Sequence, residues 1–120
     1  MREDVRIVEK PWGHEEIWAD TPRYAGKILH INSGHRLSRQ YHEKKEETIR
    51  VLSGVATIEC GIPDTPAFHA TKYAVGSIFH VTPGVVHRFC AYDGDVDLIE
   101  VSTPELDDVV RLDDDYTRNT

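Results

Sequence analysis

Turn residues break positions 24–102 into short segments, and this spacing is what most restricts the fold. Glycine, proline, asparagine and aspartate recur at close intervals, as in SG, TPG and DGD, and no stretch between them shows a helical period. Short segments divided in this way are typical of all-β sandwiches and barrels. The predicted strands cover residues 24–32, 35–42, 47–54, 55–60, 76–81, 85–92 and 96–102.

The segment 47–54 has the clearest strand period. Alternate residues starting at Glu47 share one face, and the residues between them share the other. After Gly54, residues 55–60 are predicted to pair back on this strand as a hairpin. Residues 61–70 contain two prolines, which exclude a central strand, so this segment is predicted to be a loop.

The length of 120 residues allows one hydrophobic core and is too short for two, so we expect a single domain over 1–120. Its predicted parts are a barrel core at about residues 24–103 and two arms, 1–23 and 104–120. Trp12 and Trp18 in the first arm are expected to pack on the barrel or on a second subunit, because aromatic side chains are rarely left in solvent.

The net charge of -7 is concentrated in the last segment, 104–120, which contains six acidic residues and only two arginines. No basic stripe with interleaved aromatics is present, which argues against nucleic acid as a partner. An acidic chain repels phosphorylated substrates at long range, so an anion site would need specific arginine, lysine or metal groups.

No apolar run approaches the roughly 20 residues of a membrane span. The N-terminus, MREDVRIVEK, is charged throughout, unlike a secretory signal. We therefore expect a cytoplasmic location and no membrane partner.

Four side chains in the predicted strands can bind a metal. Gln40 and His42 lie two positions apart, so both leave the same face of a strand. Glu47 begins the next strand, and the charged turn EKKE between them can return it alongside. His87 follows a Pro-Gly turn that could direct it inward. Imidazoles combined with a carboxylate are the ligands that divalent transition metals prefer.

Two motifs here resemble those of the cupin superfamily. The first consists of Gly34, Gln40, His42, Glu47 and Gly54. The second consists of Gly76, Gly84 and His87, with Thr82 and Ala91 in place of the usual proline and asparagine. The resemblance implies an all-β double-stranded β-helix, a jelly-roll barrel, with N- and C-terminal arms. It also implies a divalent metal held by Gln40, His42, Glu47 and His87, with zinc first and manganese, iron, cobalt or nickel as alternatives.

Gln40 stands where most cupins have a histidine, and this Gln-x-His pair resembles phosphomannose isomerases. VEKPWGHEEIW, YAGKILHINSGHRLSRQYH and DDVVRLDDDYTR are similar to segments of the cupin part of the type II mannose-6-phosphate isomerases. The resemblance implies that Arg111 is a catalytic or substrate-binding residue. EKKE departs from the family's histidine-rich run, and the family's large nucleotidyltransferase domain is not among these residues.

The expected activity is metal-dependent isomerisation of a sugar phosphate, from aldose to ketose through an enediol. Lys27, if it points inward, is a candidate contact for a phosphate or hydroxyl. Glu100 shares a face with Leu98 and is a candidate base. Arg111 could instead pair with its aspartate neighbours, and Arg88 is expected at the rim of the barrel.

Two alternatives remain open. One is another metal-dependent cupin enzyme acting on a sugar or sugar acid, such as a lyase, epimerase or oxygenase. The other is a non-catalytic sugar-binding cupin. In each case the expected partner is a small sugar or sugar phosphate, and the expected assembly is a homodimer, by analogy.

Overall fold

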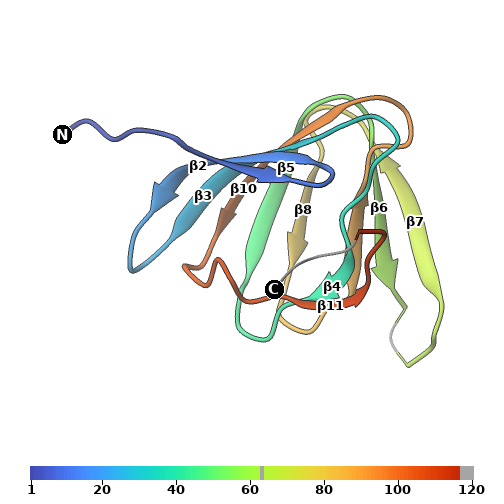
Figure 1. Cartoon of the computed structure of the whole chain (residues 1–120). Coiled ribbons are helices and arrows are strands. Elements are labelled where there is room, and N and C mark those ends of the chain that lie inside the picture. Colours follow the sequence, from blue (N-terminus) through green and yellow to red (C-terminus); the bar gives the residue numbers. More distant parts are fainter. Residues whose placement is uncertain (63, 117–120) are drawn as a thin grey trace.

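The computed structural model describes residues 1–62 and 64–116, and within them eleven strands form two antiparallel sheets (Figure 1). The six-stranded sheet has the order β1-β2-β3-β10-β5-β8, and the five-stranded sheet has the order β11-β4-β9-β6-β7. The strand bounds are β1 Arg6–Lys10, β2 Gly13–Asp20, β3 Ala25–Ile31, β4 Arg39–Tyr41, β5 Glu47–Ser53, β6 Ala56–Gly61, β7 Phe68–Tyr73, β8 Ile78–Val81, β9 His87–Cys90, β10 Val96–Ser102 and β11 Val110–Asp113.

Both sheets contribute to one hydrophobic core, which makes the architecture a jelly-roll. Leu29, Ile49 and Leu98 from the six-stranded sheet belong to the same buried cluster as Ile58 and Phe89 from the five-stranded sheet. Burying the inner faces of two sheets against each other supplies the main driving force for this kind of fold. The predicted all-β jelly-roll is confirmed.

Strand β5 confirms the predicted alternation. Glu47, Ile49 and Val51 are buried, whereas Arg50 and Leu52, on the opposite face, are exposed. The inward position of Glu47 is therefore fixed by the same two-residue period that places the core residues.

The predicted hairpin between residues 47–54 and 55–60 is wrong. β5 pairs with β10 and β8, whereas β6 pairs with β9 and β7 in the other sheet. Gly54, with φ +79°, begins the crossing from one sheet to the other. Alternation fixes which face of a strand is buried but not which strand lies beside it, so the sequence pattern fits either partner.

The predicted loop at 61–70 is too long at both ends, because Gly61 is the last residue of β6. Residues 68–70 belong to β7, which pairs along its length with β6. Of the two prolines behind the prediction, Pro66 lies between these strands and Pro63 is outside the described residues.

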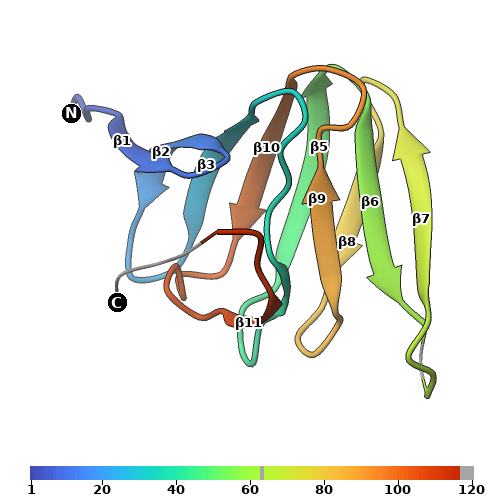
Figure 2. The ribbon, with the colours of Figure 1, turned by 45° about the vertical axis from the view of Figure 1, so that its right-hand side comes forward.

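Both predicted arms contain strands (Figure 2). β1 and β2 form a hairpin that extends the six-stranded sheet beside β3, and β11 pairs with β4. Trp12, between β1 and β2, is 3% exposed and belongs to the core. Trp18 is 43% exposed and lies against Gly26.

Arg88 is buried rather than at the rim, which corrects the expectation. Its side chain is 1% exposed, and its guanidinium donates hydrogen bonds to the backbone carbonyls of Leu37 and Asp113. Arg88 therefore ties β9 to the segment before β4 and to the end of β11. Two carbonyl acceptors let a buried arginine keep hydrogen bonds on its charged group.

The described part of the chain contains no helix with the length and apolar character that a membrane crossing requires.

The crossing at Gly54 gives a stability prediction. A Cβ there would lie 2.2 Å from the carbonyl oxygen of Asp95, in addition to the strain of a side chain at φ +79°. We expect Gly54→Ala to lower the free energy of unfolding by about 3 kcal/mol or more, measured by urea unfolding.

Gly34 provides the matched control because its φ is +82° but nothing lies within 4 Å of the position that a Cβ would take there. Gly34→Ala should therefore lower the free energy of unfolding only by the cost of placing a side chain at a positive φ, about 1–2 kcal/mol. Equal losses at the two glycines would show that the close approach at Gly54 has no energetic consequence.

Candidate functional site

Three metal-capable side chains converge between the sheets. His42 follows β4, Glu47 opens β5 and His87 opens β9. Glu47 Oε1 lies 3.6 Å from His42 Nε2 and 3.4 Å from His87 Nε2, and the three ligand atoms lie within 4.8 Å of one another. All three side chains are buried. Among the described residues, this is the one group of three histidine, cysteine or acidic side chains with metal-binding geometry.

The two imidazoles are oriented by backbone carbonyls. His42 Nδ1 donates to the carbonyl of Asp108, and His87 Nδ1 donates to the carbonyl of Val85 at 2.9 Å. A carbonyl partner requires the proton on Nδ1, so in the neutral ring Nε2 keeps a free lone pair. A hydrogen bond of this kind at the second ring nitrogen is typical of metal-binding histidines.

The remaining atoms of the triad fit a bound cation. His42 Nε2, His87 Nε2 and Glu47 Oε1 are buried and have no hydrogen-bond partner among the described residues. Buried polar atoms are seldom left unpaired, because their desolvation is not compensated. Two imidazole nitrogens and one carboxylate oxygen match the donors that divalent transition metals prefer, so these residues fit the predicted metal.

Gln40 lies beside the triad. On β4 its backbone is in register with His87 of β9 and with Arg111 of β11. Its Oε1 accepts a 2.7 Å hydrogen bond from Ser38 Oγ. Because an amide oxygen has two lone pairs, one remains for a metal. Its role as the fourth ligand stays a prediction.

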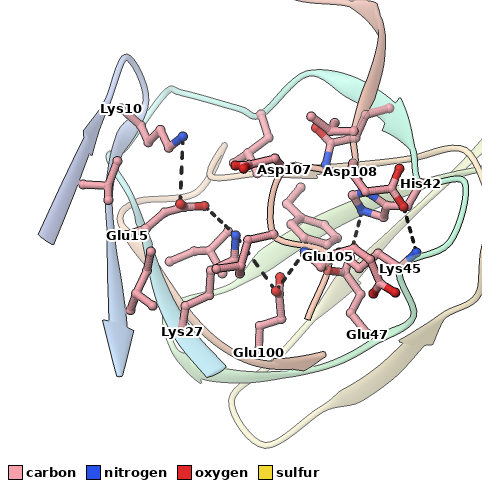
Figure 3. A pocket seen from close by; sticks show the side chains of 18 of the residues that line it. Lys10, Glu15, Lys27, His42, Lys45, Glu47, Glu100, Glu105, Asp107 and Asp108 are labelled. Carbon is pink, nitrogen blue, oxygen red and sulfur yellow. Dashed lines mark hydrogen bonds and ion pairs between the residues drawn. The ribbon is translucent and has the colours of Figure 1, made fainter. Parts of the chain in front are cut away.

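A cavity of about 710 Å³ is lined by two members of the triad, His42 and Glu47, whereas His87 lies behind its wall (Figure 3). Its wall combines side chains of β1, β2, β3, β4 and β10 with the segment 104–111. Predicted site residues in this wall are Lys27, Gln40, His42, Glu47, Glu100 and Arg111. The volume suits a small organic molecule, since ligand pockets typically measure about 300–1,000 Å³.

Lys45 is a buried member of the site that the sequence analysis missed. Its ammonium lies 3.1 Å from Glu47 Oε2 and 3.0 Å from Glu100 Oε2, and its side chain is 4% exposed. No strand pattern marks Lys45 in the sequence, because it lies in the turn before β5, where the two-residue period does not apply. The interpretation of EKKE as a charged turn did not separate Lys45 from its exposed neighbours.

The predicted pocket residue Lys27 points inward and is paired. Its ammonium lies 2.8 Å from Glu15 Oε2 and 4.0 Å from Glu100 Oε2. Lys10 in turn lies 3.9 Å from Glu15 Oε1. Together with Lys45, these pairs form a row of alternating charges that runs from Lys10 along the pocket wall to Glu47 (Figure 3).

The two buried glutamates have opposite pKa shifts. Burial alone would raise the pKa of Glu47, but its neighbours His42 and His87 and the charge of Lys45 hold it well below its usual range. Burial, reinforced by the Glu47 carboxylate, raises the pKa of Glu100 to about 7. Burial opposes the charge of Lys45, yet Glu100 and Glu47 raise the pKa of this lysine. Glu47 is therefore ionised near neutral pH, whereas Glu100 exchanges a proton there.

Arg111 is an exposed cation in the pocket wall. It lies on β11 opposite Gln40, and in the described ranges no carboxylate lies within 4.0 Å of its guanidinium. Its aspartate neighbours pair elsewhere: Asp113 with Arg88 at 3.5 Å and Asp115 with Arg36 at 2.6 Å. Arg118, the other arginine of the similar segment, lies outside the described residues.

The triad predicts metal binding that depends on His42. We expect purified protein to bind about one divalent ion per chain, and His42→Ala to lose it, because two remaining ligands hold a transition metal weakly. Metal content after dialysis measures this. His69 on β7 is exposed, and β6 lies between its strand and β9, so His69→Ala is the control. Stoichiometric metal retained by His42→Ala would contradict the ligand assignment.

Glu100 predicts a pH effect on the metal-free protein. Its folded-state pKa of about 7 exceeds the ordinary value of 4.5, so the folded state binds the proton more tightly than the unfolded state. Stability from this group is therefore present at low pH and falls as the pH rises from about 4.5 to about 7. Glu100→Gln cannot ionise, so its free energy of unfolding relative to wild type should increase between about pH 5 and about pH 8. A pH-independent difference in urea unfolding would contradict the raised pKa.

Comparisons with known proteins identify the family. The model of the family described as "Mannose-6-phosphate isomerase C-terminal" matches residues 2–114. The comparison with curated proteins found no match.

Solved structures show the same fold at low identity. CapF from Staphylococcus aureus, a capsular polysaccharide assembling protein, superposes with a TM-score of 0.79 and 17% identity over 93% of this chain and 35% of the CapF chain. KdgF from Halomonas sp. has a TM-score of 0.70 and 20% identity, covering 85% of this chain and 86% of its own. Oxalate decarboxylase from Bacillus subtilis has a TM-score of 0.77 and 13% identity, covering 91% of this chain and 30% of the decarboxylase chain.

The chain thus spans about a third of the CapF chain, and its likeness to these structures concerns the fold. The cupin resemblance of the two motifs is confirmed by the family match and by these neighbours. The chain belongs to the mannose-6-phosphate isomerase C-terminal family and has the cupin jelly-roll fold.

Proposed function

We propose that this chain is a metal-dependent sugar-phosphate isomerase of the mannose-6-phosphate isomerase type, which interconverts an aldose and a ketose through an enediol. The convergence of three unpartnered ligand atoms, from His42, Glu47 and His87, carries the proposal, because two of these residues, His42 and Glu47, line a cavity of about 710 Å³. The family match over residues 2–114 supports the reaction class.

The metal would be held by His42, Glu47 and His87, with Gln40 as the fourth ligand. Zinc is the first candidate, and manganese, iron, cobalt and nickel are alternatives, since all of these accept imidazole and carboxylate ligands. When bound, such an ion supplies Lewis-acid stabilisation for negative charge that develops on a substrate oxygen.

Glu100 is the best candidate for the general base. It is fully buried, lines the cavity, and has a pKa of about 7, which suits proton transfer near neutral pH. Its carboxylate would take the proton from the carbon next to the carbonyl and return it to the neighbouring carbon. The hydroxyl proton moves from one substrate oxygen to the other, so the isomerisation is balanced. Lys45 and Lys27 hold this carboxylate in place.

Arg111 would bind the anionic group of the substrate. It is exposed in the cavity wall and has no carboxylate partner in the described ranges, so its guanidinium is available for a phosphate. Lys27 is already paired with Glu15, so it would act as a hydrogen-bond donor to a sugar hydroxyl rather than as the main anion site.

One observation favours the second candidate, a cupin that acts on or binds a sugar without phosphate. Apart from Arg111, the basic residues of the cavity wall are paired with carboxylates: Arg6 with Asp20, Lys10 and Lys27 with Glu15, and Lys45 with Glu47 and Glu100. Alternating donors and acceptors suit hydroxyl groups better than a dianion. This candidate includes a lyase, epimerase or oxygenase acting on a sugar or sugar acid, and a non-catalytic sugar-binding cupin.

A homodimer remains part of the proposal. Trp18, Ile78 and Val101 are exposed on the six-stranded sheet and offer apolar surface to a second copy. Sedimentation at micromolar concentration decides it, because a mass of 13.7 kDa would mean a monomer. The cytoplasmic location stays a prediction.

The activity is tested by incubating metal-loaded protein with mannose 6-phosphate in D₂O and following the C2 proton by NMR. We expect exchange at this carbon and formation of the ketose phosphate. Arg111→Ala should raise KM for the sugar phosphate about 10–100-fold with a much smaller change in kcat, because it removes a charge-assisted contact. Arg50, exposed on the outer face of β5, provides the control variant Arg50→Ala.

Three other outcomes are informative. Metal binding without exchange, with the sugar recovered unchanged, would contradict the isomerase and favour the sugar-binding candidate. Turnover of mannose but not of its phosphate would favour the enzyme acting on unphosphorylated sugar. A KM unaffected by Arg111→Ala would remove Arg111 from the anion site.

A further inference from the structure

Four consecutive residues at the metal site are held by one distant aspartate. Asp108 lies between β10 and β11, and its carboxylate accepts backbone hydrogen bonds from Glu43 at 3.1 Å, Lys44 at 2.7 Å and Lys45 at 2.9 Å. Its own carbonyl accepts the hydrogen bond from His42 Nδ1. Figure 3 shows Asp108 beside His42 in the pocket.

We propose that Asp108 is a positioning residue for the metal site, which fixes the turn between the ligands His42 and Glu47 and sets the orientation of the His42 ring. The inference rests on the metal site of the proposed function.

The turn 43–46 joins the two ligands, so its conformation decides how they face each other. An isolated turn would leave three consecutive N–H groups without acceptors inside the protein. The Asp108 carboxylate satisfies all three, and hydrogen bonds to a charged acceptor are about twice as strong as neutral ones. The same carboxylate therefore fixes the backbone that connects the two ligands, although it contacts no ligand atom.

The carbonyl of Asp108 has a separate effect. His42 can direct Nε2 at Glu47 only while its ring holds one orientation and one tautomer, with the proton on Nδ1. The carbonyl provides the acceptor for that proton, and the carboxylate anchors the carbonyl in place. Loss of the carboxylate therefore releases the ring as well as the turn.

The hydrogen-bond pattern at position 108 also requires an aspartate, because both carboxylate oxygens accept. Oδ2 accepts two of the backbone bonds, from Lys44 and Lys45, and Oδ1 accepts the third, from Glu43. Asparagine can keep two of these bonds with its single oxygen, but its amide group then faces the N–H of Glu43 as a second donor. Asp108→Asn should therefore fall between wild type and Asp108→Ala.

Cobalt(II) titration tests the proposal. One titration gives both the affinity for Co²⁺ and a visible absorption spectrum that reports the ligand geometry. We expect Asp108→Ala to weaken Co²⁺ binding about 10–100-fold, the usual range when a partner of a metal-bound histidine is lost. We expect an altered visible spectrum in Asp108→Ala and an intermediate affinity in Asp108→Asn.

The matched control is Asp107→Ala, which removes the same charge from an exposed neighbour with no hydrogen bond to the 43–46 turn in the described residues. Its affinity and spectrum should stay close to those of wild type.

A second measurement is independent of the metal. In metal-free protein, ¹⁵N NMR of the histidine rings should show His42 as the Nδ1–H tautomer in wild type and Asp107→Ala, and as a mixture of tautomers in Asp108→Ala. If wild type binds no Co²⁺, the proposed function fails, and this comparison still decides the role of Asp108.

Wild-type affinity, spectrum and His42 tautomer in Asp108→Ala would overturn the proposal. Equal weakening by Asp107→Ala and Asp108→Ala would overturn it too, because charge alone would then explain the effect. If circular dichroism shows that Asp108→Ala is unfolded, Asp108→Asn decides, and wild-type behaviour in that variant counts against the proposal.

Discussion

The burial of one carboxylate, Glu47, is the constraint on which the rest of the site depends. An ionised group between two sheets loses its hydration, and this penalty is several kcal/mol unless charges and hydrogen bonds compensate it. Here Lys45 lies 3.1 Å from one oxygen, and the Nε2 atoms of His42 and His87 face the other. Neutral imidazoles with Nδ1 protonated offer that oxygen only lone pairs, so the arrangement is electrostatically complete only with a cation at their meeting point.

The same constraint explains the charged wall of the cavity. Lys45 needs more than one carboxylate nearby to remain charged when buried, and Glu100 provides the second. Glu100 then lies between Lys45 and Lys27, and Lys27 is balanced in turn by Glu15. Each buried charge is balanced by an opposite charge nearer to the surface, and the row ends at Lys10, which is partly exposed. A jelly-roll that buries a carboxylate in its interior therefore also acquires a polar pocket lined with donors and acceptors, which fits the sugar substrate proposed above.

The sequence predicted which residues of the site lie on the inward face of a strand, but it did not predict which strands lie side by side. The two-residue strand period placed Gln40, His42 and Glu47 on inward faces, and the motif spacing brought in His87. Lys45 lies outside these strands, in the turn before β5, and was missed because charged turns are usually solvated. The sheet partner of β6 could not be read from the sequence, because alternation is the same whichever strand lies alongside.

Contacts across long sequence separations were the least predictable part. Arg88 was expected at the rim, yet its hydrogen bonds to the carbonyls of Leu37 and Asp113 bury it. Asp108 looked like one more acidic residue in an acidic tail, and its three backbone partners lie more than 60 positions away. In both cases one side chain satisfies backbone groups of a segment that only the folded chain brings near, so no local pattern marks it.

The fold by itself does not select a reaction, since the same jelly-roll occurs at 13% to 20% identity in an oxalate decarboxylase, in KdgF and in CapF. What can differ between such proteins is the wall around the metal-binding residues. In this chain the strands provide the rigid triad, whereas the segment 104–111 provides Arg111 and the hydrogen bonds of Asp108. A single segment thus contributes to both the candidate metal site and the candidate anion site, so a change in its position would alter both together.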